Sequence, residues 1–408
     1  MVSGGVITVA YKPDLDRIVD AFGNLCMPDP MAVLVTYGAV AGSMFEGFPV
    51  HLFLIAPPAS GKNEILEPLF DLYKTFHIST FNESSLLSGT RHKERAANAT
   101  GGLLKQIGDG GFGRFILTEF NSVLAMNPDK RREALAALQN VCTGFLDRPV
   151  GADGGGGLHW HGKVQVLAAC TESIEEHFTA LGSVGERFIY CRLPKIDRKG
   201  HLKAAVHNSR NGSSAYWKRE RKNLVTEMFN RLEVPKCPED LITPSDESAL
   251  SAMADFSSSA RSSVSRNWKR EIEYVNAAEG PARIYQALQR TLCGMRVIGV
   301  SNEMSLRYTA RVALGSLPGL RRTIVALVAD AVCHDIAVTV PLLQQKIPYY
   351  SDSTIRRALE ELEVHGIMER VNGYRDYWAF TGDSLDNWCA GFDLEDIEEI
   401  IKNHRGAV

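Results

Sequence analysis

A lysine-containing loop between an apolar run and a helical stretch is the first place where residue types predict chemistry. Residues 50–55 predict a buried strand that stops at Ala56-Pro57-Pro58-Ala59-Ser60-Gly61-Lys62-Asn63, and residues 64–73 predict a helix. Such an arrangement binds phosphates, because backbone N–H groups and the helix start face the anion while the lysine reaches the outer phosphates. We therefore predict a P-loop that binds ATP through Ala59, Ser60, Gly61, Lys62, Asn63 and Glu64. A plain strand-to-helix turn with a surface lysine is the alternative.

An acid at the end of a second apolar strand supplies the other half of the predicted site. Residues 115–120 read Phe-Ile-Leu-Thr-Glu-Phe, and Glu119 is placed to hold the hydration shell of Mg²⁺ or to orient the attacking water. ATP and Mg²⁺ are thus the expected cofactors, with Asn63 and Glu119 facing the metal. Ala56, Asn63 and Thr118 depart from the glycine, hydroxyl residue and aspartate usual at these positions, which leaves weak hydrolysis open. A solvated edge-strand glutamate is the alternative for Glu119.

Three more polar residues extend this predicted site. Thr171 follows a third apolar strand, residues 164–170, where a hydroxyl could sense the γ-phosphate. Arg187 precedes another apolar strand and is a candidate arginine finger, which would place the active site between subunits. Arg283 lies near the start of a helical stretch, where a cation opposes the helix dipole and so hints at a separate role. For Arg187, a solvated or salt-bridged loop residue is the alternative.

The order of these motifs resembles the AAA+ core of minichromosome-maintenance (MCM)-like helicases, over roughly residues 45–300. The segments that carry the likeness are 56–63, 116–120, Thr171, 185–188 and 280–283. The closest likeness is to replicative helicases of staphylococcal cassette chromosomes and related mobile elements or phages. In that group a lysine binds phosphate, an acid drives hydrolysis, a polar sensor reads the γ-phosphate, and two arginines complete the site in a hexamer. The resemblance gives these roles to Lys62, Glu119, Thr171, Arg187 and Arg283.

The MCM-like group also has a hairpin before the sensor strand that grips DNA in a central channel. The corresponding segment here is 148–163, with a glycine-rich middle at 154–157. Arg148 and Lys163 could meet phosphates, while Trp160 could stack on bases or anchor the hairpin. A glycine-rich surface loop without a ligand is the alternative. His159 and His161 alternate on one strand face, but no acid or cysteine partner is evident in the sequence, so a metal site is not expected.

The C-terminal part predicts a winged helix over residues 320–382. Two helical patterns precede a third that starts at Ser353, and two short strands flank Asn372-Gly373, a strong hairpin signal. The start of the third helix would face a DNA major groove, with another cation on the wing. Docking of a protein is the alternative use of such a domain. The predicted DNA contacts are Ser353, Thr354, Arg356, Arg357 and Arg375.

Length and patterning complete the predicted organisation of this α/β chain. We expect a helical segment at 1–45, an AAA+ α/β core at 46–194, a helical lid at 195–310, the winged helix at 320–382 and an acidic tail at 383–408. With 408 residues, a net charge of −3, no C-x-x-C pair and no apolar run of membrane-spanning length, the chain is expected in the cytoplasm, without membrane contact. Any DNA contact must come from local basic patches.

Three functions fit the sequence. The leading one is an ATP-dependent DNA helicase or translocase that replicates a mobile element or phage, as a hexameric homo-oligomer that replication-initiation proteins could recruit. The second is an AAA+ initiator or helicase loader with weak hydrolysis, which the altered Mg²⁺ positions favour. The third is a nonenzymatic DNA-binding scaffold with a degenerate P-loop.

Overall fold

The computed structural model describes residues 12–23, 29–81, 83–87, 102–148, 158–178, 187–194, 198–210, 213–371, 377–393 and 400–401. The chain divides into two compact units, each built from several segments. The first comprises Met1–Glu172, Ile196–Leu241 and Arg290–Ser305, and the second Ser173–Lys195, Ile242–Gln289 and Leu306–Val408. The division cuts through the segment expected to form one lid, because residues 196–241 and 290–305 belong to the first unit and residues 242–289 to the second.

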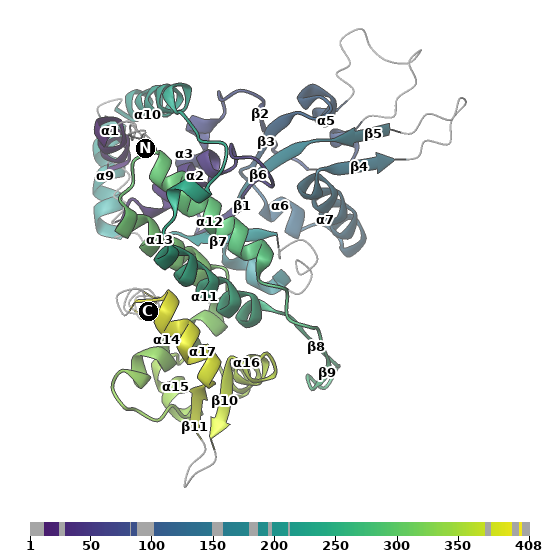
Figure 1. The fold of residues 1–408 in the computed structure, drawn as a ribbon, viewed down its shortest axis with the longest axis vertical. Coiled ribbons are helices and arrows are strands. Elements are labelled where there is room, and N and C mark those ends of the chain that lie inside the picture. Colours follow the sequence, from purple (N-terminus) through teal and green to yellow (C-terminus); the bar gives the residue numbers. More distant parts are fainter. Residues whose placement is uncertain are drawn as a thin grey trace, which may run out of the picture. The chain divides into compact units, whose positions relative to one another are not determined.

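A five-stranded sheet in the order β2-β3-β6-β1-β7 is the centre of the α/β part (Figure 1). The pairs β1–β6, β3–β6 and β2–β3 are parallel. Every residue of β1 is buried, as is every residue of β6 after the first. This burial explains why these strands read as nearly continuous apolar runs rather than as alternating ones. The strands are β1 (His51–Ile55), β2 (Thr75–His77), β3 (Phe112–Leu117), β6 (Lys163–Cys170) and β7 (Phe188–Arg192).

A chain of buried polar groups fixes the register of the three central strands. Arg114 of β3 lies opposite Gln165 of β6, and its Nε donates to the Gln165 side-chain oxygen at 3.0 Å. The Gln165 amide donates in turn to the carbonyls of Val50, before β1, and Ala39, in a neighbouring helix. Burial lowers the pKa of Arg114 to about 10. A one-residue slip would leave these buried groups unpaired, which is costly.

Helix α2 (Met31–Gly42) supports the sheet from one side. All twelve residues are buried, as the apolar stretch predicts. The Tyr37 hydroxyl donates to the Ile65 carbonyl of α3 (Lys62–Leu66) at 3.2 Å, which ties α2 to the helix after the predicted P-loop. Helix α2 also meets α12 (Ala282–Val297) so closely that a Cβ on Gly294 would lie 1.9 Å from the Gly38 carbonyl oxygen. Only glycine allows this approach.

The helix after the loop is shorter than expected. Residues 64–73 were predicted to be helical, but α3 ends at Leu66 and a 3₁₀ turn, Glu67–Leu69, follows. Pro68 explains the difference, because it has no N–H to donate to the carbonyl of residue 64 and so cannot continue an α-helix. The other helices of this part are α1 (Lys12–Gly23), α4 (Glu83–Leu86), α5 (Leu103–Ile107), α6 (Asn121–Leu124), α7 (Pro128–Thr143), α9 (Arg198–Arg210) and α10 (Ser213–Arg231).

Two antiparallel strands precede β6, as predicted. They are β4 (Phe145–Arg148) and β5 (Leu158–His161), paired from Phe145–His161 to Arg148–Leu158. Residues 149–157, the glycine-rich tip, lie outside the described residues, as does the Arg148 side chain. The described stem confirms the predicted hairpin position.

The middle of the expected helical lid contains a β-hairpin. Helix α11 (Pro244–Arg261) is followed by antiparallel strands β8 (Val264–Arg266) and β9 (Ile272–Val275), and then by α12 (Ala282–Val297) and α13 (Asn302–Gly315). The helical lid expected over residues 195–310 thus contains two short strands that were not predicted. The two strands are only three and four residues long, so their periodicity is too brief to separate strand from helix.

The C-terminal elements occur in the predicted order. Helices α14 (Gly319–Val332), α15 (Val340–Lys346) and α16 (Asp352–Val364) are followed by antiparallel β10 (Met368–Val371) and β11 (Tyr377–Phe380), and Val338 forms an isolated bridge with Trp378. Helix α17 (Gly382–Gly391) packs on α11. Arg375 and residues 394–399 and 402–408 of the predicted acidic tail lie outside the described residues. Among the helices that can be described, none is long and apolar enough to cross a membrane.

Candidate nucleotide site

The loop after β1 has an unusual backbone that only a few residue types adopt readily. Ala59 has φ of +58° and Gly61 of +82°, both in the left-handed region. The Ser60 hydroxyl donates to the Pro57 carbonyl, which closes the loop on itself. Within the described residues, no partner is recorded for the backbone N–H groups of Gly61, Lys62 and Asn63. These donors stand at the start of α3, where an anion can accept their hydrogen bonds.

Lys62 lies in the mouth of this loop. Its ammonium group donates to the Ala56 and Pro57 carbonyls, each at 2.7 Å. Its pKa is lowered, chiefly because burial disfavours the charged form; the Cys170 thiol and the carboxylates of Glu119, Glu64 and Glu172 act in the opposite direction. A phosphate would offset this desolvation with charge-assisted hydrogen bonds. The side chain is therefore suited to an anionic ligand.

The two residues that follow β3, Thr118 and Glu119, have different neighbours. Thr118, which stands where an aspartate was expected, is 2.9 Å from the His77 ring of β2. Glu119 is exposed at the end of the strand and acts electrostatically on Lys62. The backbone N–H of Phe120 donates to the Ala169 carbonyl at 3.0 Å, which holds this turn against β6. Glu119 is thus free to face a ligand, whereas Thr118 is turned to the next strand.

Thr171 has a partner that the sequence did not reveal. Its backbone N–H and hydroxyl lie 3.2 and 3.3 Å from the side-chain oxygen of Asn121, the first residue of α6. Asn121 lies two residues after Glu119. The only feature of the sequence that could have indicated this partner was therefore an amide side chain just after the acid that ends the strand. The contact between Asn121 and Thr171 links the segments after β3 and β6, and it orients the hydroxyl of the predicted sensor.

The sheet order brings these groups to one edge. Strand β6 lies between β1 and β3, so Lys62, Thr171 and Glu119 all follow the carboxyl ends of adjacent parallel strands. Ligands of open α/β sheets bind at this edge. The N–H groups and Lys62 fit ATP phosphates, while the oxygens of Asn63 and Glu119 are the hard ligands that Mg²⁺ prefers.

The two predicted arginines belong to the second unit. Arg187 directly precedes β7 and is half-buried, and Arg283 is exposed in the first turn of α12. Helix α12 begins at Ala282, close to the predicted start. Gly185 and Glu186, which carry part of the motif around Arg187, lie outside the described residues.

The hairpin stem corrects one predicted DNA contact, Trp160, and gives a second, Lys163, a partner within the fold. Trp160 is only 3% exposed, and its indole N–H donates to the Gly108 carbonyl at 3.0 Å. It therefore anchors the hairpin and offers no face for base stacking. The Lys163 ammonium donates to the Phe45 carbonyl at 3.2 Å. The pKa of Lys163 is lowered, first by burial and then by the charge of Arg290, whereas the charge of Glu46 acts to raise it. This side chain is half-buried beside the turn after α2.

The histidines of the stem have acidic partners after all. His159 is 2.8 Å from Asp147 on the paired strand, and His161 is 2.7 Å from Asp109. The expectation that these histidines lack acidic partners was therefore wrong. Asp147 on the paired strand and Asp109 in a loop are separated from them in the sequence, so the sequence did not reveal the contacts. In the part of the chain that can be described, no three His, Cys, Asp or Glu residues gather as a metal site.

At the start of α16, Ser353 and Arg356 are exposed, and Thr354 and Arg357 are half-buried. Ser351 caps the helix by accepting from Thr354 N–H, and Ser353 is exposed. The Arg356 Nε lies 2.9 Å from Asp352, an exposed pair of the kind that contributes about 0–1 kcal/mol and exchanges easily for a phosphate. The Arg357 guanidinium donates to the Ser353 carbonyl and the Thr354 hydroxyl.

Comparisons with known proteins give little beyond this geometry. No protein-family model matches the chain, and no curated protein does. Among solved structures, one from Cytophaga hutchinsonii at 2.00 Å, described as a "putative ATPase", is similar over 70% of this chain and 80% of that chain, with 13% identity and a TM-score of 0.37. So low a similarity supports no functional conclusion.

Proposed function

We propose that this protein is an AAA+ ATPase of the MCM-like type that works on DNA, with a winged helix at 320–382. The observation that carries the proposal is the convergence of Lys62, Thr171 and Glu119 at the carboxyl edge of three adjacent parallel strands. The alternative, a strand-to-helix turn without a ligand, would not require a partly buried Lys62 ammonium with the Glu119 carboxylate near it.

Each residue has a defined part in ATP hydrolysis. The Gly61, Lys62 and Asn63 N–H groups bind phosphate oxygens, and the Lys62 ammonium leaves its two carbonyl acceptors for the β- and γ-phosphates. Glu119 orients the attacking water. Thr171, held by Asn121, hydrogen-bonds near the γ-phosphate. Bound Mg²⁺ supplies charge neutralisation on the phosphates, with Asn63 and Glu119 holding its hydration shell.

Arg187 and Arg283 act in this proposal as finger and sensor arginines in a hexameric ring. Arg187 would contact the γ-phosphate bound by a neighbouring subunit, and Arg283 the phosphate of a shared site. The start of α16, with Ser353, Thr354, Arg356 and Arg357, would position duplex DNA.

Two substitutions test the nucleotide site. Lys62→Ala should abolish ATP binding, because it removes the only lysine in the loop, whereas Glu119→Gln should retain binding and lose turnover. The matched controls are Lys105→Ala and Glu133→Gln, exposed residues on α5 and α7. Binding is measured with a fluorescent ATP analogue and turnover by phosphate release. Parent-like hydrolysis by both site variants would refute the assignment.

One observation favours a second candidate, an initiator or helicase loader that binds ATP and barely hydrolyses it. Thr118 stands where an Mg²⁺-facing aspartate is expected, and its hydroxyl is engaged with His77. Tight ATP binding by the parent with negligible phosphate release, with and without DNA, would select this candidate. Failure to bind nucleotide at all would select a DNA-binding scaffold.

A further inference from the structure

The β8–β9 hairpin of the second unit carries the most exposed tryptophan among the residues described. Trp268 in its turn is 88% exposed, and Tyr274 on β9 is 62% exposed. The Lys269 ammonium lies 5.2 Å from the centre of the Trp268 ring. Two exposed rings on one short hairpin, with an ammonium group over one of them, form an aromatic and cationic surface that could meet a ligand.

The turn that presents Trp268 is well ordered. The Asn267 side chain accepts from the Glu271 N–H and donates to the Glu271 carboxylate, each at 3.0 Å. The backbone of Asn267 also bonds to Glu271 and Arg270 across the turn, and Arg270 takes a left-handed conformation with φ of +66°. These bonds fix the backbone of the turn before binding, which lowers the entropy that a ligand contact would cost.

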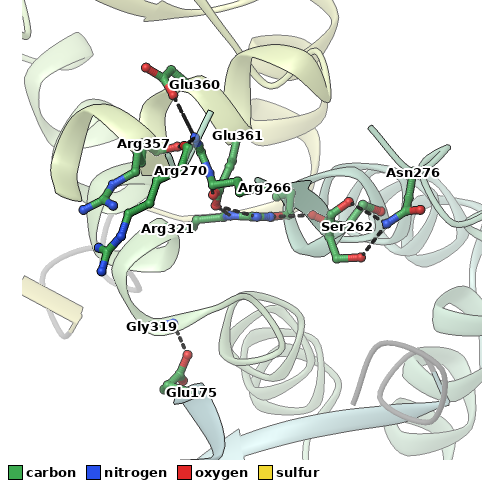
Figure 2. Close-up of polar contacts among 12 residues, drawn as sticks. Glu175, Ser262, Arg266, Arg270, Asn276, Gly319, Arg321, Arg357, Glu360 and Glu361 are labelled. Carbon is green, nitrogen blue, oxygen red and sulfur yellow. Dashed lines mark hydrogen bonds and ion pairs between the residues drawn. The ribbon is translucent and has the colours of Figure 1, made fainter. Parts of the chain in front are cut away.

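One arginine joins this turn to the predicted recognition helix. The Arg266 guanidinium donates to the Arg270 carbonyl at 2.7 Å and to the Arg357 carbonyl of α16 at 2.9 Å, and it also binds Glu360 and Glu361 (Figure 2). Because one guanidinium holds both backbones, Arg270 and Arg357 share one surface. Figure 2 shows both side chains extending away from the bonded network.

The charges on this surface favour a polyanion. Within the described part of this surface, the carboxylates of Glu360 and Glu361 are engaged by Arg266, and that of Glu271 by Asn267. No carboxylate is bonded there to Lys269, Arg270 or Arg357. Cations beside an exposed aromatic face are the combination by which proteins bind single-stranded nucleic acid, since bases stack on the ring and phosphates meet the cations. A duplex offers no unstacked base to Trp268.

We propose that the β8–β9 hairpin tip binds single-stranded DNA, with Trp268 stacking on a base and with Lys269 and Arg270 neutralising phosphates. The choice of DNA rests on the proposed function. The site complements the duplex contact proposed for the start of α16, because Arg266 fixes the two next to each other. A junction of single and double strands would then engage both.

Binding of a labelled oligo-dT strand to the full chain without nucleotide tests this site by fluorescence anisotropy. Trp268→Ala should weaken binding about 5- to 150-fold, as stacking on an aromatic ring implies, and Trp268→Phe should recover most of the loss. The matched control is Tyr73→Ala, which removes a ring that is 82% exposed beneath Lys74 on the first unit and should leave binding unchanged. Lys269→Ala should reduce the slope of log K against log salt by about 0.7.

The outcomes separate the two proposals. If the parent binds neither single-stranded nor duplex DNA, the proposed function fails and this site with it. If the parent binds oligo-dT and Trp268→Ala binds equally well, only the hairpin assignment is overturned. A change in oligomeric state in Trp268→Ala, seen by light scattering with DNA binding intact, would also overturn it and assign the ring to a contact between copies.

Discussion

Removal of Glu361 should destabilise the second unit, because this carboxylate bridges two largely buried arginines. It accepts from Arg321 at 2.7 and 3.1 Å and from Arg266 at 2.9 Å. The side chains of Arg321 and Arg266 are only 7% and 15% exposed. Arg321 also donates to the carbonyls of Ala260 and Ser262, which tie it to the end of α11 (Figure 2).

The size of the loss in stability depends on the hydrogen-bond acceptors that Arg321 and Arg266 keep when Glu361 is removed. Breaking a fully buried ion pair costs about 3–5 kcal/mol. Here Arg321 keeps two carbonyl acceptors and Arg266 keeps Glu360, so Glu361→Ala should lower the free energy of unfolding by about 2–4 kcal/mol. Glu361→Gln keeps one acceptor and should cost less. Glu363→Ala removes an exposed carboxylate on the same helix and should change stability by less than about 0.5 kcal/mol.

Urea unfolding is the suitable assay, provided that it resolves the second unit. Trp378 and Trp388 lie in that unit and are largely buried, so near-UV circular dichroism can be compared with a far-UV signal from the whole chain. Two transitions would be fitted separately, since two units need not unfold together. If Glu361→Ala and Glu363→Ala unfold at the same urea concentration, the bridge does not stabilise the fold and the reasoning is refuted.

Three further predictions concern packing, pH and assembly. Gly294→Ala should lower the free energy of unfolding by about 1–3 kcal/mol, because its Cβ would overlap a carbonyl of α2, whereas Gly23→Ala, with nothing within 4 Å, should be nearly neutral in the same urea assay. The pKa of His365 lies below its usual 6.5, first because of burial and second because of the charge of Arg321. The unfolded state therefore binds more protons near this pH, and the free energy of unfolding should fall as pH drops through 6.5. His365→Gln should flatten this dependence in urea titrations at several pH values, and a parent-like slope would contradict it. Mixing Arg187→Ala with Glu119→Gln subunits should restore part of the ATPase activity, and no recovery in rings shown to be mixed would count against a shared site.

Local patterns in the sequence predicted much of the fold. The apolar runs became β1, β3 and β6, and capping residues and a hairpin signal placed α16, β10 and β11. These elements are encoded within windows of a few residues, through side-chain periodicity, caps and turns. The end of α3 was mispredicted, although Pro68 gave a local signal.

The candidate site could be predicted in part. The positions of Lys62 and Glu119 after their own strands were predicted from the sequence, and the ends of these parallel strands meet at one sheet edge. Asn121 was missed, because its bond to Thr171 joins residues fifty positions apart. Such a partner has no local pattern in a single sequence.

The sequence by itself therefore determined which segments form strands and helices and which residue types stand at their ends. Only the tertiary structure decided that Trp160 is buried under the carbonyl of Gly108, that Arg114 pairs with Gln165, and that Arg266 joins a hairpin to α16. The physical reason is the same in each case. Burial and hydrogen bonding depend on neighbours brought together by packing, and those neighbours lie roughly fifty to ninety residues away along the chain.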